Sequence, residues 1–277
     1  MTIPTSTTAL RSVEALEHFA NAYGVALPTD VSEARQAALQ IAREARMRPS
    51  FDMQAAARAA VGADVSKSVK ALAKDAQADA AEREAMSALV TATAERAASV
   101  AQAATYSVVE AAMSGPTLRK AADDLAAILA EGDMPIVVGE DDPDGAIIHA
   151  RARKAEKVAE EFAARAAALP GFGGHIEMPV LLLLDPAQAL ENHPHGAVRA
   201  AARGIAGQTD MGAWQKRPMS AAAEFRPIAP TAPASLLLMR KGAAVTTASS
   251  LNDLDKRHDL VAESAPIRVE DNGQGWL

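Results

Sequence analysis

Hydrophobic residues recur at helical spacing near the start of the chain. The first series consists of Leu10, Val13, Leu16, Phe19 and Ala20. It predicts an amphipathic helix over residues 10–24 that ends at Gly24. A second helix is predicted from residue 30 or 32 as far as Arg48, because the residue before a proline avoids the helical region.

The longest predicted helix follows these two. Residues 52–113 contain no proline, and no glycine occurs between Gly62 and Gly115, so one helix or two collinear helices are expected, with a long helix over about 64–113. A heptad pattern places the following residues on one seam: Val65, Val69, Leu72, Ala76, Met86, Val90, Ala97, Val100 and Ala104. Asp79 and Arg83 fall on the same seam, so the coiled-coil pattern is imperfect.

The second half of this helix carries few charges. Between residues 85 and 109 the charged residues are Glu95 and Arg96, and a helix this weakly polar is usually enclosed by others. Either it is the core helix of a bundle within one chain, or it packs against copies of itself or a partner. Candidate interaction residues on it are Met86, Val90, Val100, Tyr106 and Val108. A further helix begins at Pro116, so residues 1–132 are predicted to be helical throughout.

The pattern changes at residue 133. Short apolar runs at 135–139 and 146–150 flank Asp142-Pro143-Asp144-Gly145, whose residues suit a type I turn with a bulge, and this predicts a β-hairpin. A second interpretation treats the acidic residues as a cation site; they are Glu140, Asp141, Asp142 and Asp144. A calcium loop also needs a distal bidentate glutamate, which the sequence lacks at the expected distance, so the turn is the preferred interpretation.

The following residues mix helices with short strands. A charged helix is predicted over 151–169, and the continuous aliphatic residues of 177–184 predict a buried strand. A helical turn follows from Asp185-Pro186, with the aspartate as its cap, and a further helix is predicted over 195–205. The fold class is therefore α+β, with a mainly helical N-terminal region and a mixed C-terminal region of helices and short strands.

Four prolines and little periodicity make residues 207–234 a predicted loop or extended arm. Trp214 and Phe225 are its candidate anchors, either on its own domain or on a neighbouring subunit. The last part, 235–277, is predicted to hold two strands around a turn near residue 241, a short helix that Ser250 caps, and a final strand at 267–269. The predicted regions are thus 1–132, 133–206, 207–234 and 235–277.

Charge and composition exclude several classes of function. The net charge is −7, and no dense basic cluster offers a surface for a phosphate backbone, so nucleic-acid binding is disfavoured. The chain has no cysteine, which excludes disulfides and thiolate metal sites. No signal peptide or membrane-spanning segment is recognised, so a cytoplasmic location, or a virion assembled in the cytoplasm, is predicted. No cofactor motif is present, and none is expected.

One cluster of residues has the chemistry of a metal site. Asp185 ends the predicted buried strand, and three further candidate ligands follow within a few residues: Glu191, His193 and His195. His175 and Glu177 are candidates to complete the site. The alternative is that Asp185 caps a helix while both histidines lie in a loop around Pro194, and this alternative is preferred.

Composition guides the choice of function. Roughly a quarter of the residues are alanine, and each methyl group removed from water contributes only about 0.8 kcal/mol, so a long alanine-rich helix needs a close neighbour. This predicts a structural or assembly subunit of a larger oligomer, in particular a phage virion component (capsid, neck or tail), since the alanine bias resembles that of high-G+C bacteria and their phages. A metal-dependent hydrolase that uses the Asp185 cluster, and a module that shields a binding partner, are the alternatives.

Overall fold

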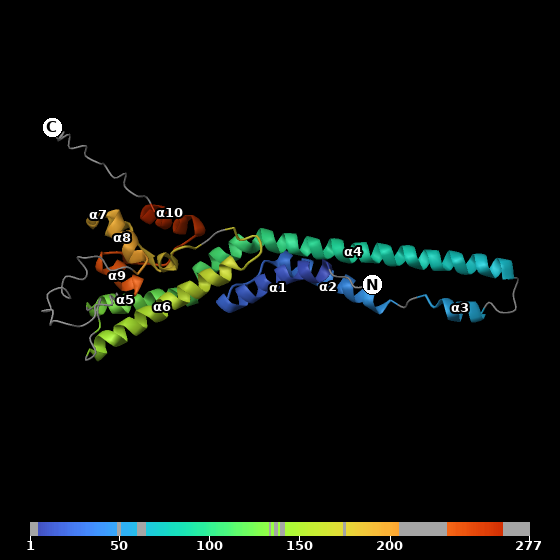
Figure 1. Cartoon of the computed structure of the whole chain (residues 1–277), viewed down its shortest axis with the longest axis horizontal. Helices are drawn as coiled ribbons and strands as arrows, with labels where there is room; N and C mark the ends of the chain where they lie inside the picture. Colours follow the sequence, from blue (N-terminus) through green and yellow to red (C-terminus); the bar gives the residue numbers. More distant parts are fainter. Residues whose placement is uncertain are drawn as a thin grey trace, which may run out of the picture. The chain divides into compact units, whose positions relative to one another are not determined.

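Helices dominate the computed structural model of the protein (Figure 1). The model describes residues 5–48, 51–59, 65–132, 134–135, 138, 142–173, 176–204 and 232–262. The chain forms two compact units. Unit 1 comprises residues 1–22, 26–108 and 169–172, and unit 2 comprises residues 23–25, 109–168 and 173–277.

The predicted N-terminal helices are all present. Unit 1 contains α1 (Thr5–Tyr23), α2 (Thr29–Met47), α3 (Met53–Ala59) and the larger part of α4 (Val65–Met113). Gly24 follows α1 with a φ of 67°, a left-handed conformation that glycine adopts without strain. An ion pair of 3.2 Å between Arg35 and Glu17 connects α2 with α1. Over 52–113 the structure describes two helices, α3 and α4, and residues 60–64 between them lie outside the described residues.

Burial along α4 is uneven within unit 1. Among the described side chains of residues 67–89 none is buried, whereas from Val90 onward one face of the helix is buried. The buried residues of this face are Val90, Ala94, Ala97, Ala101, Ala104 and Val108. Their spacing alternates between four and three residues, as in a heptad. Of the residues assigned to the predicted seam in this half, Val90, Ala97 and Ala104 are buried, whereas Val100 is half-buried. Val69, which was assigned to the same seam, is instead exposed.

Unit 2 is built on two long helices that pack against each other. These are α5 (Pro116–Glu131) and α6 (Pro143–Ala167), and α5 ends at Gly132 in the left-handed conformation, as its sequence predicted. Their facing residues include Leu125 and Phe162, which are fully buried. The ring of Tyr23, a residue of unit 2, meets the ring of Phe162 edge to face at 4.9 Å and so belongs to this core.

The predicted β-hairpin around residue 143 is wrong, because α6 begins there. The side chain of Asp142 accepts a hydrogen bond of 2.8 Å from the backbone N–H of Gly145, and Pro143 occupies the first helical turn. An aspartate cap followed by proline starts a helix as readily as it starts a turn. Residues 146–150 are therefore helical, while 136, 137 and 139 of the other predicted strand lie outside the described residues.

The buried strand predicted over 177–184 is also largely wrong. A short 3-10 helix (η1, Pro179–Leu182) precedes a two-residue strand (β1, Leu184–Asp185). The second correction concerns residues 234–240, which form α9 (Ala234–Arg240) where a strand was predicted. After the expected turn comes β2 (Ala244–Val245), which pairs with β1 in antiparallel orientation. Both leucine-rich segments are buried, as was predicted for 177–184, but most of the first and all of the second are helical.

Three further helices complete unit 2. They are α7 (Ala187–Asn192), α8 (His195–Ala202) and α10 (Leu251–Ala262). Ser250 caps α10 as predicted, since its hydroxyl accepts a hydrogen bond of 3.1 Å from the N–H of Asp253. The final strand predicted at 267–269 and most of the arm at 207–234 lie outside the described residues.

Two buried charges hold the smaller elements of unit 2 in place. Glu156 on α6 accepts hydrogen bonds from the N–H (2.7 Å) and the hydroxyl (2.8 Å) of Ser235, so it fixes the start of α9. Arg257 on α10 donates to the carbonyl oxygens of Leu181 (3.1 Å) and Thr246 (2.9 Å). Each charge therefore has hydrogen-bonding partners, which offset much of the cost of removing it from water.

Candidate interaction site

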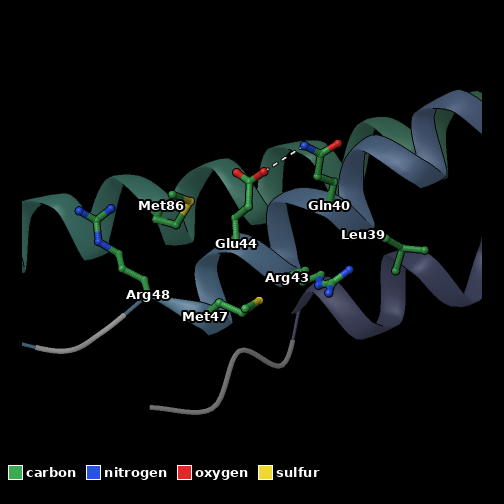
Figure 2. A pocket seen from close by; sticks show the side chains of 7 residues that line it. All are labelled: Leu39, Gln40, Arg43, Glu44, Met47, Arg48 and Met86. Carbon is green, nitrogen blue, oxygen red and sulfur yellow. Dashed lines mark hydrogen bonds between the residues drawn. The ribbon is translucent and has the colours of Figure 1, made fainter.

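A groove between α2 and α4 is the most prominent surface feature of unit 1 (Figure 2). Its volume is about 830 Å³. The residues that line it are Leu39, Gln40, Arg43, Glu44, Met47, Arg48 and Met86. All but Met86 come from the second half of α2 and its C-cap, so one helix supplies most of the surface and α4 closes it. We call this surface the α2–α4 groove.

The groove exists because α2 carries apolar residues on two faces. Val31 and Ala38 are buried on the inner face, as expected for an amphipathic helix. Leu39 and Met47 lie eight residues apart, just over two helical turns, and the accessible fractions of these side chains are 44% and 72%. Met86 of α4 is half-buried beside them. An unusual amount of apolar surface is thus open to solvent here.

Charged residues form the rim of the groove. Arg48 forms an ion pair with Glu82 of α4, and this hydrogen bond holds the pKa of Glu82 below its ordinary value. Gln40 donates a hydrogen bond of 3.0 Å to Glu44 across one turn of α2, as Figure 2 shows. Arg43 also lines the groove and has no ion pair within the part of the chain that the structure describes. The rim therefore presents a free positive charge beside the apolar surface.

Two of the residues predicted as candidate metal ligands, Asp185 and His195, lie within hydrogen-bonding distance of backbone atoms. Asp185 accepts a hydrogen bond of 2.9 Å from the N–H of Ala187 at the start of α7. His193 follows the C-terminus of that helix, and the Nδ1 atom of His195 lies 3.2 Å from the carbonyl oxygen of Leu260. Glu191 is exposed, and no group of three metal-binding side chains occurs among the described residues. His175 lies outside those residues.

The predicted interaction residues of α4 differ in their exposure. Met86 lines the groove, whereas the fold itself buries Val90 and Val108, and Val100 is half-buried. Tyr106 is exposed, with its ring 5.5 Å from the ring of Phe172. The other two predicted anchors, Trp214 and Phe225, lie outside the described residues. Of this set, Met86 and Tyr106 remain accessible to a partner over much of their surface.

Leu39 and Met47 were missed by the sequence reasoning, although a signal for them exists. Both lie on the polar side of α2 when the helix is aligned on its buried residues Val31 and Ala38. A large apolar residue on the outer face of an amphipathic helix indicates either an irregular surface or a second contact. The presence of two such residues on one side of the helix favours a contact.

A polar recess in unit 2 is a weaker candidate site. It has a volume of about 380 Å³ and is lined by residues that include Arg153, Glu156, Glu177 and Arg203. The buried Glu156 already binds Ser235 and also accepts a hydrogen bond of 2.9 Å from Arg153. Its carboxylate therefore has little hydrogen-bonding capacity left for a ligand.

Comparisons with protein-family models, with curated proteins and with solved structures give no match for this chain. Among the described helices, none is both long enough and apolar enough to cross a membrane. The α2–α4 groove, with a volume of about 830 Å³ and the exposed side chains of Leu39 and Met47 in its lining, is the candidate interaction surface of unit 1.

Proposed function

We propose that this protein is a structural or assembly subunit of a larger oligomer, and that unit 1 supplies the interaction surface. The observation that carries the proposal is the α2–α4 groove, where Leu39 and Met47 remain exposed beside Met86. Burying one such side chain completely contributes about 1.5–3 kcal/mol. A partner that covers the groove would gain this energy without any change in the fold.

The uncovered half of α4 supports the same function. Residues 67–89 form several helical turns without a buried side chain, and helices in proteins owe most of their stability to packing. Alanine favours the helical conformation but offers little surface for burial by the rest of its own chain. Assembly would supply the neighbouring polypeptide that this segment lacks within the described part of the chain.

The narrower hypothesis is that the oligomer is a phage virion, with this chain in the capsid, neck or tail. Its support is the alanine-rich composition together with the absence of recognisable catalytic motifs in the sequence. Mass spectrometry of purified native particles tests it, and a chain found only free in the cytoplasm would contradict it. A hydrolase that uses the cluster around Asp185 has no comparable support, because the Asp185 carboxylate already accepts a hydrogen bond from the N–H of Ala187 at the start of α7.

Light scattering of the full chain over a wide concentration range tests the general proposal. We expect the average mass to rise with concentration, and Met47→Lys to reduce this rise because it places a charge in the apolar groove. Leu260→Lys is the matched control, since Leu260 is an exposed leucine of unit 2 outside the groove. A wild-type protein that remains a monomer at every concentration, with no partner subunit in native particles, would contradict the proposal.

A further inference from the structure

We infer that the uncovered half of α4 pairs with the same segment of a second copy of this chain, in antiparallel orientation and about a two-fold axis at Gln77. This inference rests on the proposed function, and it names the partner and the part of the partner that binds. The contact surface is the 70–84 face, which consists of the exposed side chains of Lys70, Ala73, Gln77, Ala81 and Glu84. Spacing, charge and side-chain size support the pairing.

The 70–84 face runs along one side of a continuous helix (Figure 1). Lys70, Gln77 and Glu84 follow one another at intervals of seven residues, so they lie close to one line along α4. With Ala73 and Ala81 between them, the intervals along the face are three, four, four and three residues. The spacing is therefore the same in both chain directions, which allows the face to meet its own copy about a two-fold axis.

The two charges of the face have opposite signs and lie at equal distances from Gln77. In the antiparallel pair, Lys70 of each copy therefore lies level with Glu84 of the other copy. Both side chains are exposed, and neither forms an ion pair within the part of the chain that the structure describes. The charges at 79, 82 and 83, in contrast, already belong to ion pairs of this chain. Lys70 and Glu84 are thus available for complementary contacts with a second copy.

The remaining charges of the segment do not oppose the pairing. The lysines at 67 and 74 border the face and lie level with a serine and an alanine of the partner, at 87 and 80, so they meet no like charge. The acidic residues at 75, 79 and 82 lie on the opposite side of the helix, because successive residues are rotated by about 100°. A parallel pair in register would instead place Lys70 against Lys70 and Glu84 against Glu84, and the repulsion between these like charges disfavours it.

Small side chains let the two helices approach closely. Ala73 of each copy lies level with Ala81 of the other, and Val69, which is 58% exposed beside the face, is removed from water by the contact. Two Gln77 side chains meet at the axis, where each amide group can donate and accept a hydrogen bond. A polar residue at such a position fixes register and orientation at a cost in stability. Because exposed ion pairs also contribute little to affinity, the pair is weak in dilute solution and is strengthened by the high local concentration within an assembly.

The 70–84 face lies on the other side of α4 from the α2–α4 groove. Met86, which lines the groove, follows Gln77 by nine residues, or two and a half helical turns, so the two side chains leave the helix in opposite directions. The pairing therefore leaves the groove open. A face that binds its own copy about a two-fold axis joins two chains and no more, so growth beyond a dimer needs a second contact, which the groove remains free to make.

Introduced cysteines test the geometry directly, because the chain contains none of its own. Gln77→Cys in the full-length protein places two thiols at the two-fold axis, so mild oxidation should give a disulfide-linked dimer on a non-reducing gel. Glu95→Cys, at an exposed position of α4 beyond the paired segment, is the control. The dimer of Gln77→Cys should form at least about tenfold faster than that of Glu95→Cys, since pairing raises the local concentration of its thiol.

A second pair of cysteine variants distinguishes antiparallel from parallel helices. Ala73→Cys and Ala81→Cys should each cross-link slowly alone, because residue 73 faces residue 81 in the antiparallel pair. An equal mixture of the two variants should cross-link fast and give mainly a heterodimer, identified by mass spectrometry of the linked peptides. If Ala73→Cys forms its own dimer as fast as the mixture forms the heterodimer, the antiparallel arrangement is overturned.

Charge reversal tests the complementarity without a covalent bond. Lys70→Glu and Glu84→Lys each replace two attractive contacts of the pair by two repulsive ones, so each should weaken dimerisation in sedimentation equilibrium at least about tenfold. The double variant restores both contacts with their signs exchanged and should regain dimerisation. All are made in the Met47→Lys background, so that the groove does not contribute, and Glu95→Lys is the control. Equal dimerisation of the single and double variants would overturn the pairing.

The substitutions are at exposed positions, so the circular dichroism spectrum and the melting temperature should not change. If the mass of the wild type rises with concentration but Gln77→Cys cross-links no faster than Glu95→Cys, this inference fails and the general assembly function survives. Met47→Lys should leave the cross-linking of Gln77→Cys unchanged, because the groove lies on the other side of α4. A wild-type chain that stays a monomer at all concentrations overturns this inference, and the same result, together with the lack of a partner in native particles, overturns the proposed function.

Discussion

The two units of this protein distribute their large apolar side chains differently. Unit 2 buries long runs of leucine around Phe162, with residues 181–184 and 236–238 among the most completely buried in the chain. In unit 1 the buried face of α4 consists mostly of alanine and valine. Most of the large exposed hydrophobic residues that the structure describes belong to unit 1: Leu39, Met47, Met53, Val69, Leu89 and Tyr106. Unit 2 thus buries most of its large apolar side chains within its own core, whereas unit 1 leaves several of them exposed and available for contacts.

The physical basis of this difference is the size of the side chains. A buried alanine contributes about 0.8 kcal/mol through its methyl group, whereas a fully buried leucine contributes about 1.5–3 kcal/mol. Alanine allows helices to approach closely and favours the helical conformation, but it leaves a small margin of stability. We therefore expect substitutions in unit 2 to affect folding and substitutions at the exposed sites of unit 1 to affect assembly.

The largest effect on folding is expected from Arg257→Ala in unit 2. The side chain of Arg257 is almost fully buried and donates to the carbonyl oxygens of Leu181 and Thr246, and it also pairs with Asp253 at 3.2 Å. Its removal leaves buried acceptors without donors, and we expect the free energy of unfolding to fall by about 3–5 kcal/mol. Chemical denaturation measures this change. Lys256→Ala, at the neighbouring exposed position, should change stability by less than about 0.5 kcal/mol.

A pair of leucine substitutions separates the two units directly. Leu181→Ala removes a fully buried side chain of unit 2 and should lower the free energy of unfolding by about 2–5 kcal/mol. Leu39→Ala removes an exposed side chain of unit 1 and should change it by less than about 0.5 kcal/mol, while it weakens self-association. Denaturation and light scattering on the same samples give both quantities. Equal losses of stability in the two variants would remove the distinction between the units.

The sequence predicted the helices of unit 1 well because their patterns are long and have clear ends. Gly24, Pro49 and Pro116 mark boundaries that the structure reproduces to within a few residues, and α4 covers almost the predicted range. The heptad pattern also contained three residues of the buried face of α4, Val90, Ala97 and Ala104. Local backbone rules and helical periodicity therefore suffice where the helix is long.

The same rules failed in the short elements of unit 2. Asp142-Pro143 fits both a turn and a helix start, and the tertiary packing of α6 decides between them. Four consecutive leucines at 181–184 have no periodicity, so their burial could be predicted but not their conformation.

The α2–α4 groove could not be predicted from the sequence, for a different reason. It requires α2 to lie beside α4 so that Met47 and Met86 line the same surface, and this neighbourhood is not encoded in either segment alone.

A smaller effect on stability is expected from substitutions in α4. One half of this helix has no buried side chain among the described residues and the other half has a buried face, so the two halves differ in burial as the two units do. Ala81→Gly in the uncovered half should cost about 1 kcal/mol of helix stability, because glycine disfavours the helix. The loss should stay local and increase amide hydrogen exchange within residues 67–89, since no described side chain there is buried. Ala97→Gly in the covered half also removes a buried methyl group, so it should destabilise unit 1 as a whole.

Mass spectrometry of hydrogen exchange distinguishes these results peptide by peptide. Ala81→Gly is expected to leave the exchange of α5 and α6 unchanged. If it accelerates exchange throughout the protein, the uncovered half of α4 is part of a cooperative core, and the comparison between the two halves fails.

The smallest effect is expected from pH, and it tests whether unit 2 is as self-sufficient as its packing suggests. His258 on α10 is half-buried, and its Nε2 atom is buried without a hydrogen-bond partner among the residues that the structure describes. Burial lowers its pKa below the ordinary value of 6.5, although Glu177, Asp255 and Asp259 act in the opposite direction. The unfolded chain therefore binds this proton more readily than the folded chain does.

The sign of the pH dependence follows from that difference. The contribution of His258 to stability is complete above pH 6.5 and is lost as the pH falls from 6.5 through the lower pKa of the folded state. Denaturation curves from about pH 7.5 to about pH 5.5 should show this decline in the wild type, and His258→Gln should flatten it because glutamine does not titrate. His193→Gln, near the end of α7, should keep the wild-type slope. If the free energy of unfolding of His258→Gln depends on pH as that of the wild type does, protonation of His258 does not destabilise the fold. Unit 2 would then be less tightly packed around α10 than its buried side chains indicate.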